Sequence, residues 1–104
     1  MNQVDLSGHM ADFASLPRMT PLLREDGLRS FLLHLKASEE MPEHKTRGAI
    51  TVQCLHGRAL FIEGEDRAEL VPGMVLSVRG GAPHSVAAQA DSLMLVTVSD
   101  VAAG

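Results

Sequence analysis

The feature that most constrains the fold is a rhythm of short apolar runs separated by turn residues. After Thr20, glycine-containing turns recur about every 8–12 residues, and no long stretch of helical periodicity interrupts them. Strands that alternate with long helices would indicate an α/β fold, but this spacing is typical of an antiparallel sandwich or barrel. The chain is therefore predicted to be all-β.

Individual strands follow from runs of alternating or continuous apolar residues. The predicted strands span residues 21–24, 28–36, 49–56, 58–63, 67–71, 74–78, 84–89 and 92–99. In the second of these, Phe31, Leu33 and Leu35 form an apolar face, and His34 falls on the more polar face opposite. Closing these strands into a jelly roll would remove most of the exposed sheet edges.

The rest of the chain shows less pattern. Residues 1–19 are predicted to be an N-terminal extension that packs on a partner chain, with one helical turn over 11–16. Residues 38–48 are polar and contain Pro42, so a loop is predicted there. The single barrel domain is expected to span 20–104.

Charge and cysteine content exclude several classes of function. The net charge is −4, and Lys and Arg occur singly, so neither nucleic acid nor an anionic membrane is an expected partner. No apolar stretch is long enough to span a bilayer, and no signal peptide is recognisable. Cys54 is the only cysteine and cannot form an intrachain disulfide, so the protein is expected to be cytoplasmic.

Aromatic side chains are scarce, with three Phe and neither Trp nor Tyr. Recognition of sugars and bases commonly depends on stacking against aromatic faces. The interior of the barrel is therefore expected to be lined by Leu, Val, Ile, Ala and Met, which suits a mostly apolar ligand.

Two segments resemble the paired motifs of the cupin superfamily. The first family motif, G-x5-H-x-H-x(3–4)-E-x6-G, aligns with SEEMPEHKTRGAITVQCLHG, which starts at Ser38 in place of the glycine. His44 matches the first histidine and Gly57 the last glycine, whereas Thr46 and Ile50 replace the second histidine and the glutamate.

The second family motif, G-x5-P-x-G-x2-H-x3-N, aligns with GMVLSVRGGAPHSVAA. Gly73, Gly81 and His84 match in identity and spacing, while Arg79 and Ala88 replace the proline and the asparagine. The resemblance covers about residues 28–99 and implies a jelly-roll barrel, also called a double-stranded β-helix.

Cupins usually hold Fe, Mn, Zn or Ni through three imidazoles and a carboxylate inside the barrel. The resemblance therefore implies a divalent metal on His44 and His84, although half of the usual ligand set is replaced. Three side chains are candidates for a replacement ligand, namely His34, Cys54 and Gln53. Each also has a plainer interpretation: His34 and Gln53 as outward polar residues, Cys54 as a small buried apolar one.

Three functions remain open from the sequence. The first is a non-enzymatic cupin that binds a small molecule in a lumen where His44, His84 and Thr46 supply polar contacts, with Ile50 and Met41 on the apolar wall. The second is a metal-dependent enzyme of the dioxygenase or isomerase type. The third is a regulatory or structural module, and a homodimer is expected because small stand-alone cupins usually form one.

Overall fold

The computed structural model describes residues 1–100, so the last four residues of the predicted barrel range lie outside the described part. Residues 1–100 form two short helices followed by nine strands. They are α1 (Leu6–Ala11), the 3₁₀ helix η1 (Phe13–Ser15), β1 (Met19–Glu25), β2 (Leu28–Leu35), β3 (Glu40–His44), β4 (Ile50–His56), β5 (Ala59–Glu63), β6 (Asp66–Leu70), β7 (Val75–Val78), β8 (His84–Ala88) and β9 (Ser92–Ser99). No helix within residues 1–100 is long and apolar enough to cross a bilayer.

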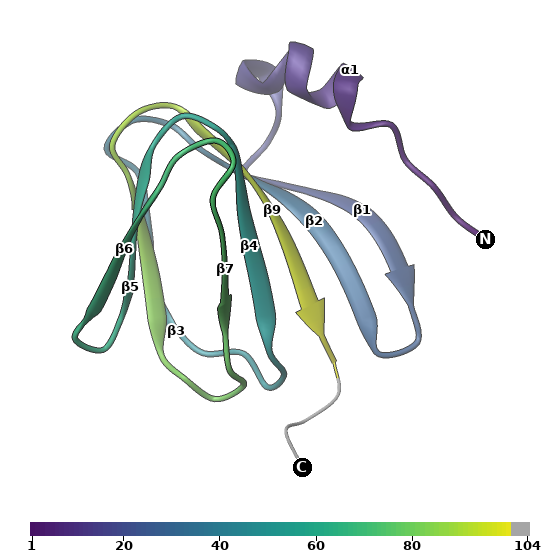
Figure 1. The fold of residues 1–104 in the computed structure, drawn as a ribbon. Coiled ribbons are helices and arrows are strands. Elements are labelled where there is room, and N and C mark those ends of the chain that lie inside the picture. The colour runs from purple at the N-terminus through teal and green to yellow at the C-terminus, as the bar shows by residue number, and fades with distance from the viewer. Residues whose placement is uncertain (101–104) are drawn as a thin grey trace.

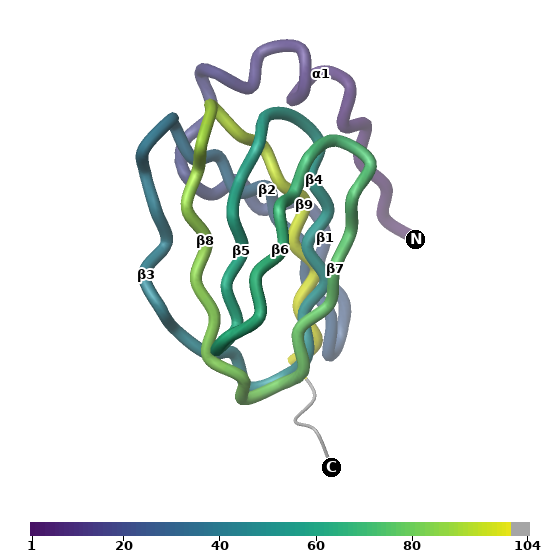
Figure 2. Tube along the Cα trace, turned by 60° about the vertical axis from the view of Figure 1, so that its left-hand side comes forward, coloured from purple at the N-terminus to yellow at the C-terminus, as the bar shows by residue number. Residues whose placement is uncertain are grey.

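The strands form two antiparallel sheets that face each other (Figure 1). The larger sheet has the order β1-β2-β9-β4-β7, and the smaller one has the order β3-β8-β5-β6 (Figure 2). Strands that are distant in sequence are therefore neighbours, as in a jelly roll. This architecture confirms the all-β prediction.

The predicted loop over 38–48 is wrong, because β3 lies inside it and pairs with β8. Met41 is opposite Val86 and His44 is opposite His84, so β3 has one more residue between these two pairs than β8 has. This is a β-bulge, and the bulge contains Pro42, which has no N–H to donate to the ladder. A bulge and a proline break the period of two, so the sequence pattern did not indicate a strand.

The core lies between the inner faces of the two sheets, and aliphatic side chains dominate it. Its buried members are Leu33, Leu35, Ile50, Val52, Cys54, Ala59, Phe61, Leu70, Val78, Ala82, Val86, Ala88, Met94, Val96 and Val98. Alternate residues of each strand point into this layer, as the period-two pattern predicts.

The outer face of the larger sheet is covered at one end by the N-terminal segment, residues 2–16, which we call the N-terminal strap. Leu32 and His34 on β2 were expected on a more polar, half-exposed face, yet they are 0% and 4% exposed. The ring of Phe13 contacts the ring of His34 edge-on, with centroids 5.6 Å apart. The strap thus packs on this chain's own sheet, and its packing on a partner chain stays a prediction. Its helical part is α1 plus η1 rather than one turn over 11–16.

Ser38, at the position of the first glycine in the cupin motif, has a left-handed backbone conformation. Its φ is +75°, the only positive φ at a non-glycine position among the described residues. This left-handed conformation is costly for a residue with a Cβ atom. The Ser38 N–H donates to the carbonyl of Ala88 at 3.0 Å, and this bond holds the turn in place.

We therefore expect Ser38→Gly to raise the free energy of unfolding by about 0.5–1 kcal/mol, since glycine adopts this conformation without steric cost. Urea denaturation of both proteins measures the difference. Ser77→Gly is the matched control: Ser77 lies on an ordinary exposed strand, β7, and its substitution should destabilise the fold. A destabilised Ser38→Gly protein would contradict the strained-turn interpretation.

Candidate functional site

The pairing of β3 with β8 places the two predicted histidines next to each other at the mouth of the lumen. His44 and His84 are directly opposite in the register, and their ring centroids are 4.5 Å apart at an interplanar angle of 66°. The side chain of His44 is exposed, whereas His84 is only 3% exposed. One ring therefore faces the entrance and the other faces the interior.

Both imidazoles are held by the backbone in the same way. Nδ1 of His44 lies 2.9 Å from the carbonyl oxygen of Pro42, and Nδ1 of His84 lies 2.9 Å from that of Ala82. A carbonyl oxygen can only accept a hydrogen bond, so Nδ1 carries the proton in each neutral ring. Nε2 of each ring is then left with a free lone pair.

The two motif loops are tied to each other beside this pair. The Gly81 N–H donates to the carbonyl of Thr46 at 2.7 Å, and Gly81 has a φ of +81°. The hydroxyl of Thr46 donates to the carbonyl of Gly48 at 2.9 Å. The hydroxyl proton of Thr46 is thus used locally, and its backbone fixes the loop that precedes His84.

A half-open cavity of about 50 Å³ continues inward from the histidines. Apart from the two imidazoles, its walls are apolar: Phe31, Leu33, Met41, Ile50, Val52, Phe61, Val86, Met94 and Val96. Ile50 and Met41 thus lie on this apolar wall. The expectation of a purely aliphatic lining was wrong, because two of the three Phe rings face the lumen. The ring of Phe61 stacks on His84 with centroids 5.5 Å apart.

Burial makes His84 a weak base. The pKa of its imidazole is lowered, mainly because removal from water disfavours the charged ring, and the nearby His44 adds to this. The bond to Ala82 and the negative charge of Glu63 act in the opposite direction but do not cancel the effect of burial. At neutral pH His84 is therefore an uncharged ring that can accept a hydrogen bond at Nε2.

The structure does not bring the other predicted ligands to this pair. His34 points out of the barrel, and its Nδ1 donates to the carbonyl of Leu16 at 2.9 Å under the strap. Gln53 is exposed on the outer face of β4. Cys54 is buried in the core, where its thiol lies 3.4 Å from the carbonyl of His56, and burial raises the pKa of that thiol. None of the three lines the cavity.

Glu63 is the residue that sequence reasoning missed. It is the last residue of β5 and lies directly opposite His84 of β8 in the register. Glu63, His84 and His44 thus form one row across three neighbouring strands, on the face that carries Phe61. Its strand parity with Phe61 was the signal that could have identified it.

The described residues do not fit the metal centre that the resemblance implies. The free Nε2 lone pairs suit a transition metal, but such centres in proteins use at least three protein ligands. No group of three or more His, Cys, Asp or Glu side chains able to hold an ion occurs within residues 1–100. Ile50 occupies the carboxylate position, so no chemical step is derived through a metal here.

Comparisons with known proteins agree with this architecture. A scan against protein-family models and a search of curated proteins give no match. Among solved structures, a cupin superfamily protein from Desulfitobacterium hafniense superposes with a TM-score of 0.74 at 23% identity, covering 78% of this chain and 74% of its own. An RmlC-like cupin from Desulfovibrio desulfuricans gives 0.71 at 26% identity over 79% and 80%.

A third structure, from Ralstonia eutropha, has a description that suggests a mannose-6-phosphate isomerase. It superposes with a TM-score of 0.76 at 19% identity, covering 97% of this chain and all of its own. The chain therefore folds as a small cupin domain. Likeness at this level of identity defines the fold and leaves the activity open.

The lowered pKa of His84 predicts how the free energy of unfolding depends on pH. Above the unfolded value of 6.5 the ring is neutral in both states, so it contributes no pH dependence. Below that value the unfolded chain binds the proton more readily than the folded chain does. The free energy of unfolding therefore decreases as the pH is lowered, by at most about 1.4 kcal/mol per pH unit.

Urea denaturation of the wild type and of His84→Gln between pH 8 and 5 measures this contribution. The wild type should lose more stability below pH 6.5 than the variant does. His56→Gln, at an exposed histidine outside the lumen, is the control for the type of substitution, because it leaves His84 in place. Parallel curves for the wild type and His84→Gln would contradict the assignment.

Proposed function

We propose that this protein binds a small molecule whose short apolar end enters the lumen and whose polar group stays at the histidine pair. The observation that carries this proposal is the pair of backbone-held imidazoles, each with a free Nε2 acceptor, beside an apolar cavity that side chains do not fill. Few polar groups at the rim of an apolar pocket are typical of ligand sites.

The size of the cavity limits what can enter. A volume of about 50 Å³ is far below the roughly 300–1,000 Å³ of pockets that enclose a drug-sized ligand. A group of a few non-hydrogen atoms fits, and the rest of the molecule must remain outside next to His44. Both rings accept at Nε2, so the group at the rim should carry an N–H or O–H donor.

A metal-dependent enzyme of the dioxygenase or isomerase type is the second candidate. One observation favours it: Glu63 lies in the same cross-strand row as His84 and His44 and could supply a carboxylate. This candidate needs Glu63 to move toward the imidazoles, because the present arrangement contains no three-ligand group among the described residues. The binding function needs no such movement.

Three further expectations stay predictions. They are a homodimer, a cytoplasmic location, and the absence of nucleic acid and membrane partners. Apolar side chains exposed around β7, namely Val71, Met74 and Val75, offer one surface on which a second copy could pack.

The binding proposal can be tested by NMR with a library of fragments of up to about ten non-hydrogen atoms that combine a short apolar group with one donor. We expect hits to shift the amide signals of Val86, Val96 and His84. His44→Gln should weaken these hits about fivefold, since one hydrogen bond contributes about 1 kcal/mol. His56→Gln is the matched control and should bind them as the wild type does.

Two results would contradict the proposal. One is a set of hits that bind His44→Gln and the wild type equally, or that shift only residues outside the lumen. The other is stoichiometric metal in untagged protein that Glu63→Gln loses, which would favour the enzyme. Metal below about 0.1 ion per chain after loading would exclude the enzyme instead.

A further inference from the structure

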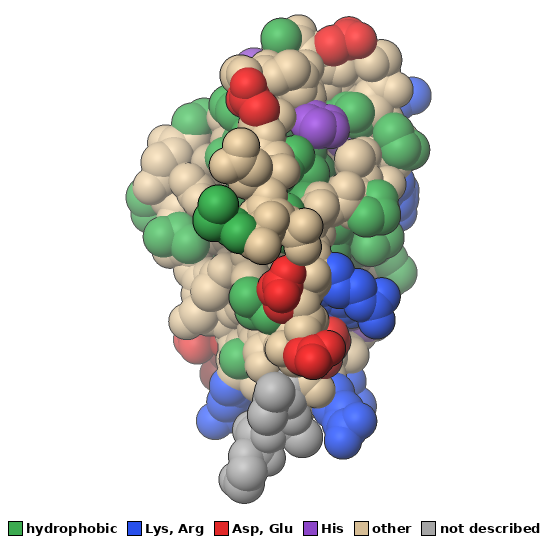
Figure 3. Space-filling model, turned by 90° about the vertical axis from the view of Figure 1, so that its right-hand side faces the viewer, with side chains coloured by type: hydrophobic (Ala, Val, Ile, Leu, Met, Phe, Trp, Pro, Cys, Tyr) green, Lys and Arg blue, Asp and Glu red, His purple; other side chains and the backbone are tan. Residues whose placement is uncertain are grey.

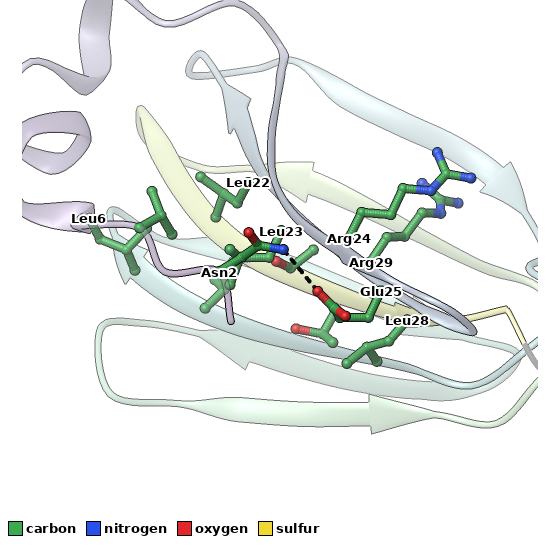
Figure 4. A pocket seen from close by; sticks show the side chains of 12 residues that line it. Asn2, Leu6, Leu22, Leu23, Arg24, Glu25, Leu28 and Arg29 are labelled. Carbon is green, nitrogen blue, oxygen red and sulfur yellow. Dashed lines mark hydrogen bonds between the residues drawn. The ribbon is translucent and has the colours of Figure 1, made fainter.

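A space larger than the lumen lies under the N-terminal strap. A half-open cavity of about 420 Å³ lies between the strap and the outer face of the larger sheet (Figure 4). Val4 and Leu6 of the strap form its roof. Its floor is a row of directly opposed residues on β1, β2 and β9: Leu23, Ser30 and Thr97.

The strap is fastened on both sides of this cavity. At one end the side-chain amide of Asn2 donates to a carboxylate oxygen of Glu25 at 3.0 Å. At the other end the Nδ1–H of His34 donates to the carbonyl of Leu16 at 2.9 Å, and the backbone N–H of His34 donates to the carbonyl of Arg18, just after the strap, at 2.8 Å. The cavity therefore lies between the two places where the strap is hydrogen-bonded to the sheet, at Asn2 and at Leu16.

The lining is mostly apolar, and the guanidinium groups of its two arginines are directed away from its leucines. Arg24 and Arg29 belong to the rim, but they are paired in the register and share the inner face with Phe31. Figure 4 shows their guanidinium groups side by side and directed away from Leu6 and Leu22. The Arg29 guanidinium lies 5.8 Å from the centre of the Phe31 ring, on that inner side.

The other polar groups of the lining are two hydroxyls, the side-chain amide of Asn2 and one carboxylate. Ser30 and Thr97 contribute hydroxyls in the middle of the floor, and the carboxylate of Glu25 lies at the edge. Figure 3 shows the molecule from this side, where hydrophobic side chains are exposed and both acidic and basic side chains also occur. A carboxylate-bearing ligand would meet Glu25 without a compensating cation. An uncharged ligand with a hydroxyl group meets no such cost.

We propose that the cavity under the strap is a second binding site, which takes an uncharged aliphatic molecule bearing a hydroxyl group. Its volume falls within the roughly 300–1,000 Å³ typical of small-molecule sites, whereas the lumen is far smaller. The aliphatic part packs between Leu6 and Leu23, and the hydroxyl bonds with Ser30 or Thr97. This site is independent of the histidine pair.

The test is an NMR titration of the full chain with 1-octanol, and with octanoate as the charged analogue of the same length. We expect saturable octanol shifts at the amides of Ser30, Leu95 and Thr97, and slower amide exchange over residues 4–6. Octanoate should bind at least about tenfold more weakly, because no cation faces the cavity.

Thr97→Leu fills the cavity floor and should weaken octanol binding at least about fivefold. The matched control is Thr51→Leu: Thr51 is the next residue in the same cross-strand row, on β4, and does not line the cavity. Leu6→Ala removes part of the roof without altering the sheet, so it tests the site even where Thr97→Leu fails to fold.

Four results would overturn the proposal. They are octanol shifts confined to the lumen, equal affinity for octanoate, binding that neither Thr97→Leu nor Leu6→Ala weakens, and no binding at all. In the last case, light scattering that shows a dimer and protected amides on β2 and β9 would mean that a second copy covers this face.

Discussion

The pairing of β3 with β8 is the constraint on which the lumen depends. Its bulge directs both Met41 and His44 inward although they are three residues apart, and an unbroken strand would place them on opposite faces. Without the bulge the side chain of His44 would point away from the mouth of the lumen, and the ring of His84 would lose its contact with the ring of His44. Pro42 serves this geometry twice, because it suits the bulge and its carbonyl holds the imidazole of His44.

The outer face of the larger sheet depends on a different histidine. His34 is buried, its ring is bonded to the strap at Leu16, and Phe13 contacts that ring. The same strap closes the larger cavity, so one segment hides a polar side chain and creates an apolar space beside it. The lumen and the cavity under the strap are thus separate: the lumen is narrow with acceptors at its mouth, and the cavity under the strap is wider and lined mainly by aliphatic side chains.

Much of the fold could be predicted because the period of two and the turns are local properties of the sequence. The strand that was missed, β3, combines a bulge with a proline, and neither leaves a periodic trace. His44 and His84 could be selected through the resemblance, but their contact depends on register. Glu63 was missed because cross-strand neighbours are not visible in the sequence, and His34 was misjudged because the strap that covers it has no strand pattern.

The central claim is that two imidazoles meet at the mouth of the barrel with Nδ1 protonated and Nε2 free. Long-range ¹H–¹⁵N NMR of the histidine rings, combined with ring-to-ring nuclear Overhauser effects at about pH 7.5, tests this directly. The account predicts the Nδ1–H tautomer for His44 and for His84, with a clear Overhauser effect between the two rings. Nε2–H tautomers for both residues, or rings with no mutual effect, would contradict it.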